Sequence, residues 1–376
     1  MGITRVGNVS GLDKIGVPVI MVCRPNSRSI AVSQGKGLTL AAAKASGLME
    51  AVEGYHAERI TLPLKLASYE ELRYSHNVVD VSQLPQIAYG AFHPNLPLLW
   101  IEGHDILQDE RAWVPYELVH LNHTLPNAPG TGCFVASSSG LASGNHILEA
   151  ISHGICEVVE RDATTLWHLK KEVARRDTRV DLRTVEDQDC LTVAEQYQRA
   201  GVDVAVWETT SDVGIPAFRC LTTERNSSRL RPLPSAYGFG CHPARKIGLL
   251  RALTEAAQSR LTLIAGSRDD LGREAYEHVL SPATAAEDIA EMNDCAAMRE
   301  FGENPNFESE TFEDDVAWEL ARLRSAGIAH VIVVDLTKPE FGVPVVRVVI
   351  PGLEPGESAA GHFPGLRAQA ILEGRS

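Results

Sequence analysis

The helix expected over residues 145–163, NHILEAISHGICEVVERDA, constrains the fold more than any other stretch of the chain. At about 100° per residue, its polar side chains fall within roughly a third of the circumference. They are Asn145, Glu149, His153, Glu157 and Glu160. Nearly all the remaining side chains are apolar, so the helix carries one narrow and mainly acidic strip.

Two interpretations fit this strip. In the first, an amphipathic helix exposes its acids to water. Exposed helices usually balance Glu with Lys at i,i+4, and like charges at that spacing cost a few tenths of a kcal/mol per pair. The apolar arc here is also far wider than the roughly 100° that a surface helix needs. A buried helix whose acidic strip lines a cavity is therefore the favoured interpretation.

The same polar spacing recurs on two further helices, expected over residues 39–59 and 247–263. Each carries a polar triplet with offsets of four and seven residues amid small and apolar side chains. The triplets are Ser46, Glu50, Glu53 and Arg251, Glu255, Gln258. All three helices follow a Gly-rich turn, so chance amphipathicity would have to occur three times.

Convergence of the three stripes would bring six carboxylates together. They are Glu50, Glu53, Glu149, Glu157, Glu160 and Glu255. Clustered charges need partners, and Mg²⁺ is the natural one because it bridges one or two carboxylates to phosphates. The pattern therefore predicts an ATP site with more than one Mg²⁺. Arg161 and Arg251 are candidates for the phosphates, and Ser46, Asn145 and Gln258 for the ribose or base.

The predicted ATP site has no familiar nucleotide motif. SQGKG, residues 33–37, is not a Walker sequence, and no Rossmann glycine pattern occurs. Lys36 stands between two glycines ahead of a helix, where it either faces an anion or belongs to a plain turn. Both interpretations stay open.

Composition excludes several classes of protein. A net charge of −14 disfavours nonspecific nucleic-acid binding. There is no apolar run of about 18 residues for a membrane span and no apolar segment for a signal peptide. The seven cysteines are scattered without a C-x-x-C pair, which is typical of reduced thiols rather than of zinc or disulfide sites. A cytoplasmic protein is expected.

Strands and helices are mixed without a βαβ rhythm, so the expected fold class is α+β with mixed or antiparallel sheets. Residues 202–210 and 215–224 predict a hairpin, and residues 112–123 a strand pair. Residues 266–376 are expected to hold an acidic loop, then a helix and strands. We expect one domain over 1–376, with N-terminal strands and the first site helix in 1–62 and the other two site helices in 63–265.

Three long motifs resemble those of the YcaO family. SSSGLASGNHILEAISHGICEVVERDA is similar to its central signature. GKGLTLAAAKASGLMEAVEGYHAE and GCHPARKIGLLRALTEAAQSR are similar to its flanking signatures, in the same order. The resemblance covers nearly the whole chain.

This resemblance implies an ATP-dependent enzyme that phosphorylates the oxygen of a peptide-backbone amide after a nucleophile attacks its carbonyl. A neighbouring Cys, Ser or Thr as nucleophile gives an azoline, and external sulfide gives a thioamide. The resemblance assigns Mg²⁺ and ATP binding to most of the residues selected above by helical spacing. These are Ser46, Glu50, Glu53, Asn145, Glu149, Glu157, Glu160, Arg161, Arg251 and Glu255.

The chain departs from the family pattern at two places. A Ser-x6-Glu-x3-Gln pattern of some members reads Ala142, Glu149 and His153 here, and the Pro-x-Pro-x-Pro ending of many azoline-forming members is replaced by QAILEGRS. The stretch VVRVVIPGLEP resembles members that work beside a TfuA-type partner, a group associated with thioamide formation. Thioamidation of a peptide or protein with a TfuA-like partner is therefore the leading hypothesis.

Two alternatives stay open, an azoline-forming cyclodehydratase and a non-catalytic ATP-binding assembly subunit. A homodimer is one possible oligomeric state of the protein. The candidates for a general base are His153 and His242. A lone His is more often structural, so no catalytic residue is assigned. Cys241 is expected to be a buried thiol.

Overall fold

The computed structural model describes residues 1–90, 92–225, 233, 235–294, 298–303, 305–356 and 361–374. These residues form two compact units. Unit 1 comprises Met1–Ala51, Lys171–Thr210 and Ile215–Glu308, and unit 2 comprises Val52–Lys170, Ser211–Gly214 and Ser309–Ser376. The expected single domain over the whole chain stays a prediction.

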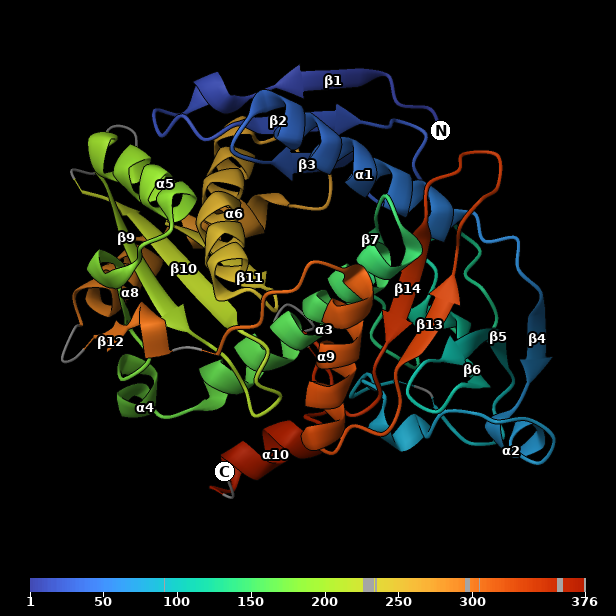
Figure 1. Cartoon of the computed structure of the whole chain (residues 1–376). Coiled ribbons are helices and arrows are strands. Elements are labelled where there is room, and N and C mark those ends of the chain that lie inside the picture. The colour runs from blue at the N-terminus through green and yellow to red at the C-terminus, as the bar shows by residue number, and fades with distance from the viewer. Residues whose placement is uncertain are drawn as a thin grey trace. The chain divides into compact units, whose positions relative to one another are not determined.

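Unit 1 contains three small sheets (Figure 1). The first is antiparallel with β1 (Arg5–Asn8), β2 (Val19–Cys23) and β3 (Val32–Lys36). The second is antiparallel in the order β11 (Ala236–Cys241), β10 (Ala217–Glu224) and β9 (Val202–Glu208). The third pairs β12 (Arg299–Glu300) with β8 (Val180–Asp181) in parallel.

The longest helix of unit 1, α6 (Arg245–Ala265), packs against β11 and β10. The others lying entirely in this unit are α4 (Glu172–Arg176), α5 (Gln188–Arg199), α7 (Arg273–Val279) and α8 (Pro282–Asn293). Tyr197 of α5, Phe218 of β10 and Leu249 and Leu253 of α6 are fully buried in one core. Helix α1 (Leu40–Glu58) contributes its residues up to Ala51 to unit 1 and the rest to unit 2.

Unit 2 is built on a six-stranded sheet whose pairings are all antiparallel. The order is β4 (Leu64–Ala67), β5 (Leu98–Asp105), β13 (Ile332–Asp335), β14 (Val345–Val349) and β7 (Leu141–Ser143), with β6 (Glu110–Pro115) also paired to β5. Its helices are α2 (Tyr69–Leu72), α3 (Ile147–Leu169), α9 (Phe312–Ser325) and α10 (Leu366–Leu372). Helix α3 packs on β14, β7 and α9.

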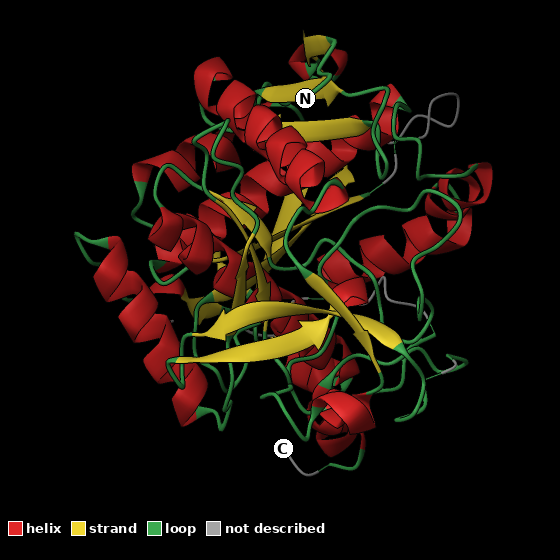
Figure 2. Ribbon diagram, turned by 90° about the vertical axis from the view of Figure 1, so that its right-hand side faces the viewer, coloured by secondary structure: helices red, strands yellow, loops and turns green. Residues whose placement is uncertain are grey.

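The α+β class with antiparallel sheets is confirmed, and helices and strands occur in both units. Figure 2 shows the helices and strands by colour. The predicted hairpin is also present, because β9 and β10 pair antiparallel. The predicted strand pair over residues 112–123 is wrong beyond Pro115, where a short 3₁₀ turn follows. The carboxylate of Glu117 in this turn accepts hydrogen bonds from the backbone N–H of Gly132, Cys133 and Phe134 at 2.6, 3.1 and 3.0 Å. That long-range contact overrides the local strand propensity.

Helices α7 and α8 form in the acid-rich region from about 265 to 315, where the weak sequence pattern predicted no helix. Helix α8 has the local features of a helix start. Ser281 is its N-cap, with its side chain accepting from Thr284 N, and Pro282 follows in the first turn. Met292 buries its side chain at the other end of the helix.

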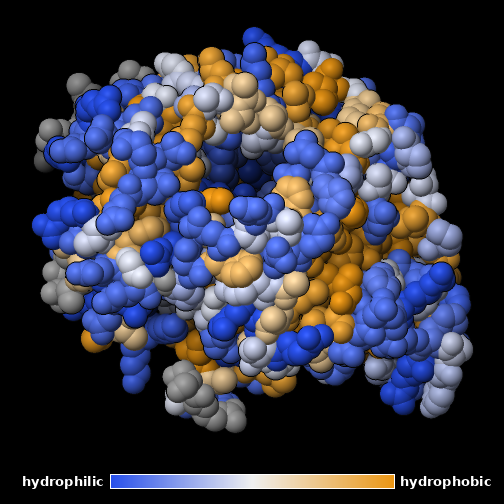
Figure 3. All heavy atoms as spheres, viewed as in Figure 1, coloured by the Kyte–Doolittle hydropathy of each residue, from blue (hydrophilic) through white to orange (hydrophobic). Residues whose placement is uncertain are grey.

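The described part of the chain contains no helix that is both long and apolar enough to cross a membrane. Hydrophilic side chains cover much of the face shown in Figure 3, with hydrophobic ones between them. Six cysteines are free thiols, and Cys295 lies outside the described residues.

Candidate functional site

In unit 1, the predicted site residues occupy the accessible faces of α1 and α6. Arg251, Glu255 and Gln258 are partly exposed, whereas Leu249 and Leu253 on the same helix are fully buried. Ser46 and Glu50 of α1 are exposed. The four- and seven-residue spacing therefore marks the solvent-accessible face of α6.

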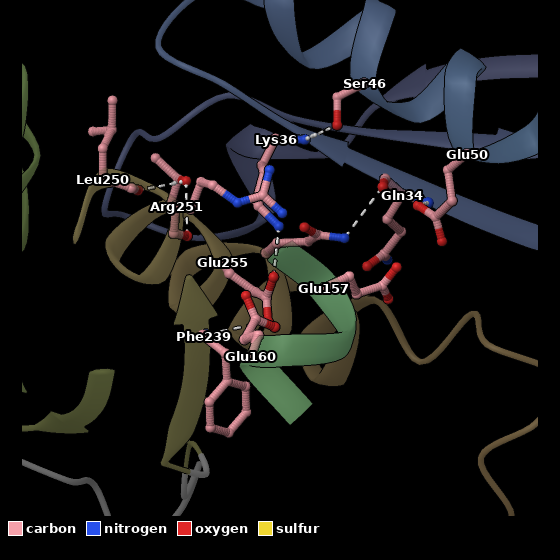
Figure 4. A network of polar contacts seen from close by, with 12 residues as sticks. Gln34, Lys36, Ser46, Glu50, Glu157, Glu160, Phe239, Leu250, Arg251 and Glu255 are labelled. Atoms are coloured by element: carbon pink, nitrogen blue, oxygen red, sulfur yellow. Dashed lines mark hydrogen bonds and ion pairs between the residues drawn. The ribbon is translucent and has the colours of Figure 1, made fainter. Parts of the chain in front are cut away.

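The side chain of Lys36 on β3 lies against the carboxylate of Glu255 on α6 (Figure 4). Lys36 Nζ and Glu255 Oε2 are 2.7 Å apart, and Glu255 Oε1 accepts from the backbone N–H of Phe239 at 3.2 Å. The backbone N–H of Lys36 donates to Ser46 Oγ at 3.4 Å. Lys36 thus pairs with a carboxylate of the chain itself and lies beside two predicted site residues, Glu255 and Ser46. Whether it also faces a bound anion stays a prediction.

Gln34, two residues earlier on β3, links the same two helices through its backbone. Its N–H donates to Glu50 Oε2 at 3.0 Å, and its carbonyl accepts from Gln258 Nε2 at 3.2 Å. The side chain is only 5% exposed and hydrogen-bonds Thr262 of α6. Helical spacing could not identify Gln34, because it lies on a strand and contributes mainly main-chain groups.

Glycines bring these strands close to the helix backbones in unit 1. A Cβ on Gly35 would lie 2.0 Å from the backbone N of Gly47 in α1. A Cβ on Gly238 would lie 2.2 Å from the carbonyl oxygen of Ala252 in α6, and one on Gly240 only 2.1 Å from that of Gly248. Only glycine fits at these contacts, because a Cβ would overlap backbone atoms of the helix. Close packing of this kind positions α1 and α6 against β3 and β11.

In unit 2, α3 is buried along most of its length. Ala150, Ile155 and Val159 are at most 1% exposed. In the middle of the helix, the partly exposed polar positions are His153, Glu157 and Arg161. Val158 and both ends of the helix are also partly exposed. Most of the helix is therefore buried, as expected, and its partly exposed middle positions are polar, although Glu160 of the strip is buried. That the strip lines a cavity stays a prediction.

Three of the predicted acids in unit 2 accept hydrogen bonds within the unit. Glu149 Oε2 accepts from the backbone N–H of Asn145 at 2.6 Å, and from its side-chain amide at 3.1 Å. Glu157 Oε2 accepts from the backbone N–H of Gly140 at 3.2 Å. Ser143 Oγ on β7 donates to Glu53 Oε1 at 2.6 Å. Each of these three carboxylates thus has at least one oxygen oriented by a hydrogen bond.

Arg161 lies beside two of the acids on its own helix. Its Nη2 is 3.7 Å from Glu157 Oε1, and its Nη1 is 3.6 Å from Glu160 Oε1. Glu160 is only 3% exposed. These three side chains form the densest group of charges among the predicted site residues of unit 2.

The donor chemistry of the two sets fits magnesium and a nucleoside triphosphate. Carboxylates are the hard oxygen ligands that Mg²⁺ prefers, and guanidinium groups bind phosphate oxygens. Among the described residues, no group of three or more His, Cys, Asp or Glu is arranged to hold a metal. A preformed protein site is not required for Mg²⁺, since this ion usually binds one or two carboxylates and completes its coordination shell with phosphates and water.

The two histidines considered as a general base stay unassigned. His242 Nδ1 accepts from the backbone N–H of Ala244 at 3.0 Å, just before α6 begins. This contact is structural. His153 is half-buried on the strip of α3. Cys241 is 1% exposed, which confirms a buried thiol.

The sequence matches the family model described as YcaO cyclodehydratase, ATP- and Mg²⁺-binding, over residues 34–354. A relative from Rhizobium leguminosarum bv. trifolii, named as an uncharacterized protein in the tfuA 3′ region, is 38% identical over 378 residues. The aligned part covers 99% of this chain and 89% of the relative. An uncharacterized protein of Methanothermobacter thermautotrophicus is 35% identical, with 94% of this chain and 90% of the relative covered. The chain belongs to the YcaO family.

Solved structures agree with this fold. YcaO from Methanopyrus kandleri, solved with AMPPCP and Mg²⁺, matches with a TM-score of 0.72 at 23% identity, covering 96% of this chain and 90% of that one. A heterocyclase in complex with substrate and cofactor matches with a TM-score of 0.77 at 23% identity, covering 94% of this chain. The present chain spans 50% of the length of that heterocyclase.

Proposed function

We propose that this protein uses ATP to activate a backbone amide of a ribosomally made peptide or protein, and that the product is a thioamide. The observation that carries the proposal is that Glu149, Glu157 and Arg161 are partly exposed on α3, a helix that is mostly buried. Membership of a family described as ATP- and Mg²⁺-binding cyclodehydratases supports ATP-dependent chemistry. The relative named for its place in a tfuA 3′ region supports a TfuA-like partner and hence a thioamide.

The proposed reaction is balanced with hydrosulfide as the nucleophile. Sulfur attacks the amide carbon, and the carbonyl oxygen takes the γ-phosphoryl group of ATP with release of ADP. Loss of that oxygen as phosphate leaves the C=S bond. Amide, hydrosulfide and ATP thus give thioamide, ADP and phosphate.

In this proposal the chain's own residues bind and orient the nucleotide. The six glutamates Glu50, Glu53, Glu149, Glu157, Glu160 and Glu255 hold Mg²⁺. Arg161 and Arg251 bind phosphate oxygens, and Ser46, Asn145 and Gln258 bind the ribose or base. Lys36 and Glu255, which form an ion pair at 2.7 Å, exchange part of that contact for the nucleotide.

Azoline formation is the second candidate. It uses the same activation with a neighbouring Cys, Ser or Thr as the nucleophile, so the peptide loses water overall. The family description as cyclodehydratase favours it. The third candidate is a non-catalytic ATP-binding assembly subunit.

Mass spectrometry separates these candidates. The protein is incubated with ATP, Mg²⁺, sulfide, a TfuA-like partner and candidate peptides. Exchange of one oxygen for sulfur supports the thioamide, and loss of one water supports the azoline. ATP binding without consumption, under every combination, leaves only the assembly subunit.

Two substitutions test the proposed nucleotide site. Glu160→Gln and Arg251→Ala are each expected to reduce peptide-dependent ATP consumption by about 100-fold or more, because each removes a charge that faces the phosphates. Glu195→Gln and Arg199→Ala, which alter an exposed ion pair on α5, are the matched controls. If all four variants consume ATP like the wild type, the site assignment is wrong.

A further inference from the structure

Unit 2 contains an open pocket of which the nucleotide assignment uses only one lining residue, Arg161. Most of its lining is apolar, with side chains such as Leu118, Val135 and Ile350. Three charged residues also line it, Arg161 from α3, Arg347 from β14 and Glu354. Both carboxylate oxygens of Glu354 already accept backbone hydrogen bonds at 2.9 Å, from Gly365 and Ala368. Because Arg161 belongs to the proposed nucleotide-binding set, the pocket borders that part of the site.

Arg347 is a buried cation with open hydrogen-bonding capacity. It is 3% exposed, and its Nη2 donates to the carbonyl oxygen of Ser137 at 2.7 Å. Its Nε and Nη1 have no hydrogen-bond partner among the described residues. Arg260 of unit 1 is also buried and its Nη1 likewise lacks a partner, but its charge is paired with Asp13 at 2.8 Å and Glu224 at 2.7 Å, whereas the structure gives Arg347 no ion pair within the described residues. A buried guanidinium with unused donors is costly unless a ligand completes it.

The charges around Arg347 do not supply that partner. Burial lowers the pKa of Arg347 to about 10, against the opposing effect of Glu157, so the side chain stays charged at neutral pH. The pKa of His120 is lowered to about 4 by burial, then by the positive charges of His123 and Arg347. His120 is therefore neutral at pH 7, and it neither adds to nor offsets the positive charge of Arg347.

The chemistry of the pocket favours separate carbonyl oxygens over a phosphate or a carboxylate. Nε and Nη1 lie on different edges of the planar guanidinium, so both cannot bind one carboxylate. A phosphate would carry about two charges into a mostly apolar pocket. A peptide backbone instead offers carbonyl oxygens in succession, and its apolar side chains fit the remaining lining.

We propose that this pocket receives the peptide segment that carries the target amide, with Arg347 Nη1 donating to the carbonyl oxygen of that amide. This inference rests on the proposed function. Attack of the nucleophile places negative charge on that oxygen, and a preorganised donor of fixed positive charge stabilises it. The same oxygen must then reach the γ-phosphoryl group, which accords with a pocket that shares Arg161 with the nucleotide set.

Substitution of Arg347 tests the assignment. Arg347→Met is expected to reduce kcat for peptide modification by about 100- to 1000-fold, the usual effect of removing one oxyanion donor. The affinity for AMPPCP with Mg²⁺ is expected to stay within threefold of the wild type. Arg347→Lys retains the charge and is expected to recover part of the rate. Arg324→Met is the matched control, because Arg324 also donates to a carbonyl in unit 2, that of Leu107, and lies outside the pocket.

A second measurement isolates the charged oxygen. Capped hexapeptides with the central amide replaced by a phosphinate carry a stable tetrahedral anion. The wild type is expected to bind them about 100-fold more tightly than Arg347→Met does, with a much smaller ratio for the parent amides. A second variant, Val135→Phe, keeps Arg347 and narrows the pocket, so it is expected to raise KM for the peptide. This variant tests the pocket even if Arg347→Met does not fold.

The outcomes distinguish the two proposals. If Arg347→Met folds and modifies peptide within threefold of the wild type, or if Val135→Phe leaves KM unchanged, the pocket assignment is overturned and the proposed function stands. If the wild type consumes no ATP with any peptide and partner, both are overturned.

Discussion

The carboxyl group of Glu319 on α9 is fully buried against α3 in unit 2. Ser152 Oγ donates to its Oε1 at 2.7 Å, and Cys156 Sγ lies 3.3 Å from the same oxygen. Burial raises the pKa of Glu319 to about 8, although the hydrogen bonds from Ser152 and Cys156 act in the opposite direction. The side chain therefore keeps its proton near neutral pH.

This protonation predicts a pH-dependent stability. The pKa of Glu319 rises from 4.5 to about 8 on folding, so between these values the folded state holds a proton that the unfolded state has lost. Its contribution to the free energy of unfolding therefore falls as pH rises through that window, by at most about 1.4 kcal/mol per pH unit, and levels off above it.

Glu319→Gln removes this titration and keeps an acceptor for Ser152. Its free energy of unfolding relative to the wild type is expected to increase from pH 5 to pH 8, measured by urea denaturation. Glu313→Gln, an exposed position of the same helix, is the control. A difference between Glu319→Gln and the wild type that is constant over this range would show that Glu319 ionises normally.

At the scale of secondary-structure elements, the contact between β11 and α6 depends on glycine. Gly238→Ala places a Cβ 2.2 Å from two backbone atoms of α6, Ala252 O and Ala256 N. Because backbone atoms cannot move independently, we expect a loss of about 1–3 kcal/mol in the free energy of unfolding. Displacement of α6 is also expected to lower ATP consumption, since this helix carries Arg251 and Glu255.

Gly7→Ala on β1 is the matched control, because no atom lies within 4 Å of the added Cβ. Its effect is expected to stay within about 0.5 kcal/mol. Chemical denaturation of both variants measures the difference. Equal effects at the two positions would contradict a packing role for Gly238.

The long helices were predictable from the sequence because their side-chain spacing is a local property. The helix expected over residues 39–59 is observed as α1 (Leu40–Glu58), and the one over 247–263 as α6 (Arg245–Ala265). Short elements were not predictable in the same way. The 3₁₀ turn after Pro115 depends on Glu117 contacts to residues about 15 positions further along the chain, which no local pattern contains.

At the scale of the whole molecule, the net charge of −14 predicts that nucleotide binding requires a divalent cation. Six of the proposed site residues are glutamates, which repel a triphosphate unless Mg²⁺ lies between them. At 100 times its Kd, AMPPCP with Mg²⁺ is expected to stabilise the folded state by about 2.7 kcal/mol, raising the Tm by several degrees. AMPPCP with EDTA is expected to leave the Tm unchanged.

Differential scanning fluorimetry makes this comparison with Mg²⁺ alone as a further control. Glu160→Gln is expected to reduce the shift seen with AMPPCP and Mg²⁺. A Tm that rises equally with and without the cation would argue against carboxylate-bound magnesium at this site.

The sequence by itself determined which side chains share a strip on each long helix, and through its three motifs it determined the family. Helical periodicity acts over a few residues, so Glu149, Glu157 and Glu160 could be grouped before any tertiary contact was known. Only the tertiary structure decided that Lys36 pairs with Glu255, 219 positions away, and that Gln34 joins α1 to α6. It also decided that Arg347, in an ordinary β-branched strand sequence, is buried with unused donors in a pocket. These features depend on which distant segments pack together, and that packing has no local signature in the chain.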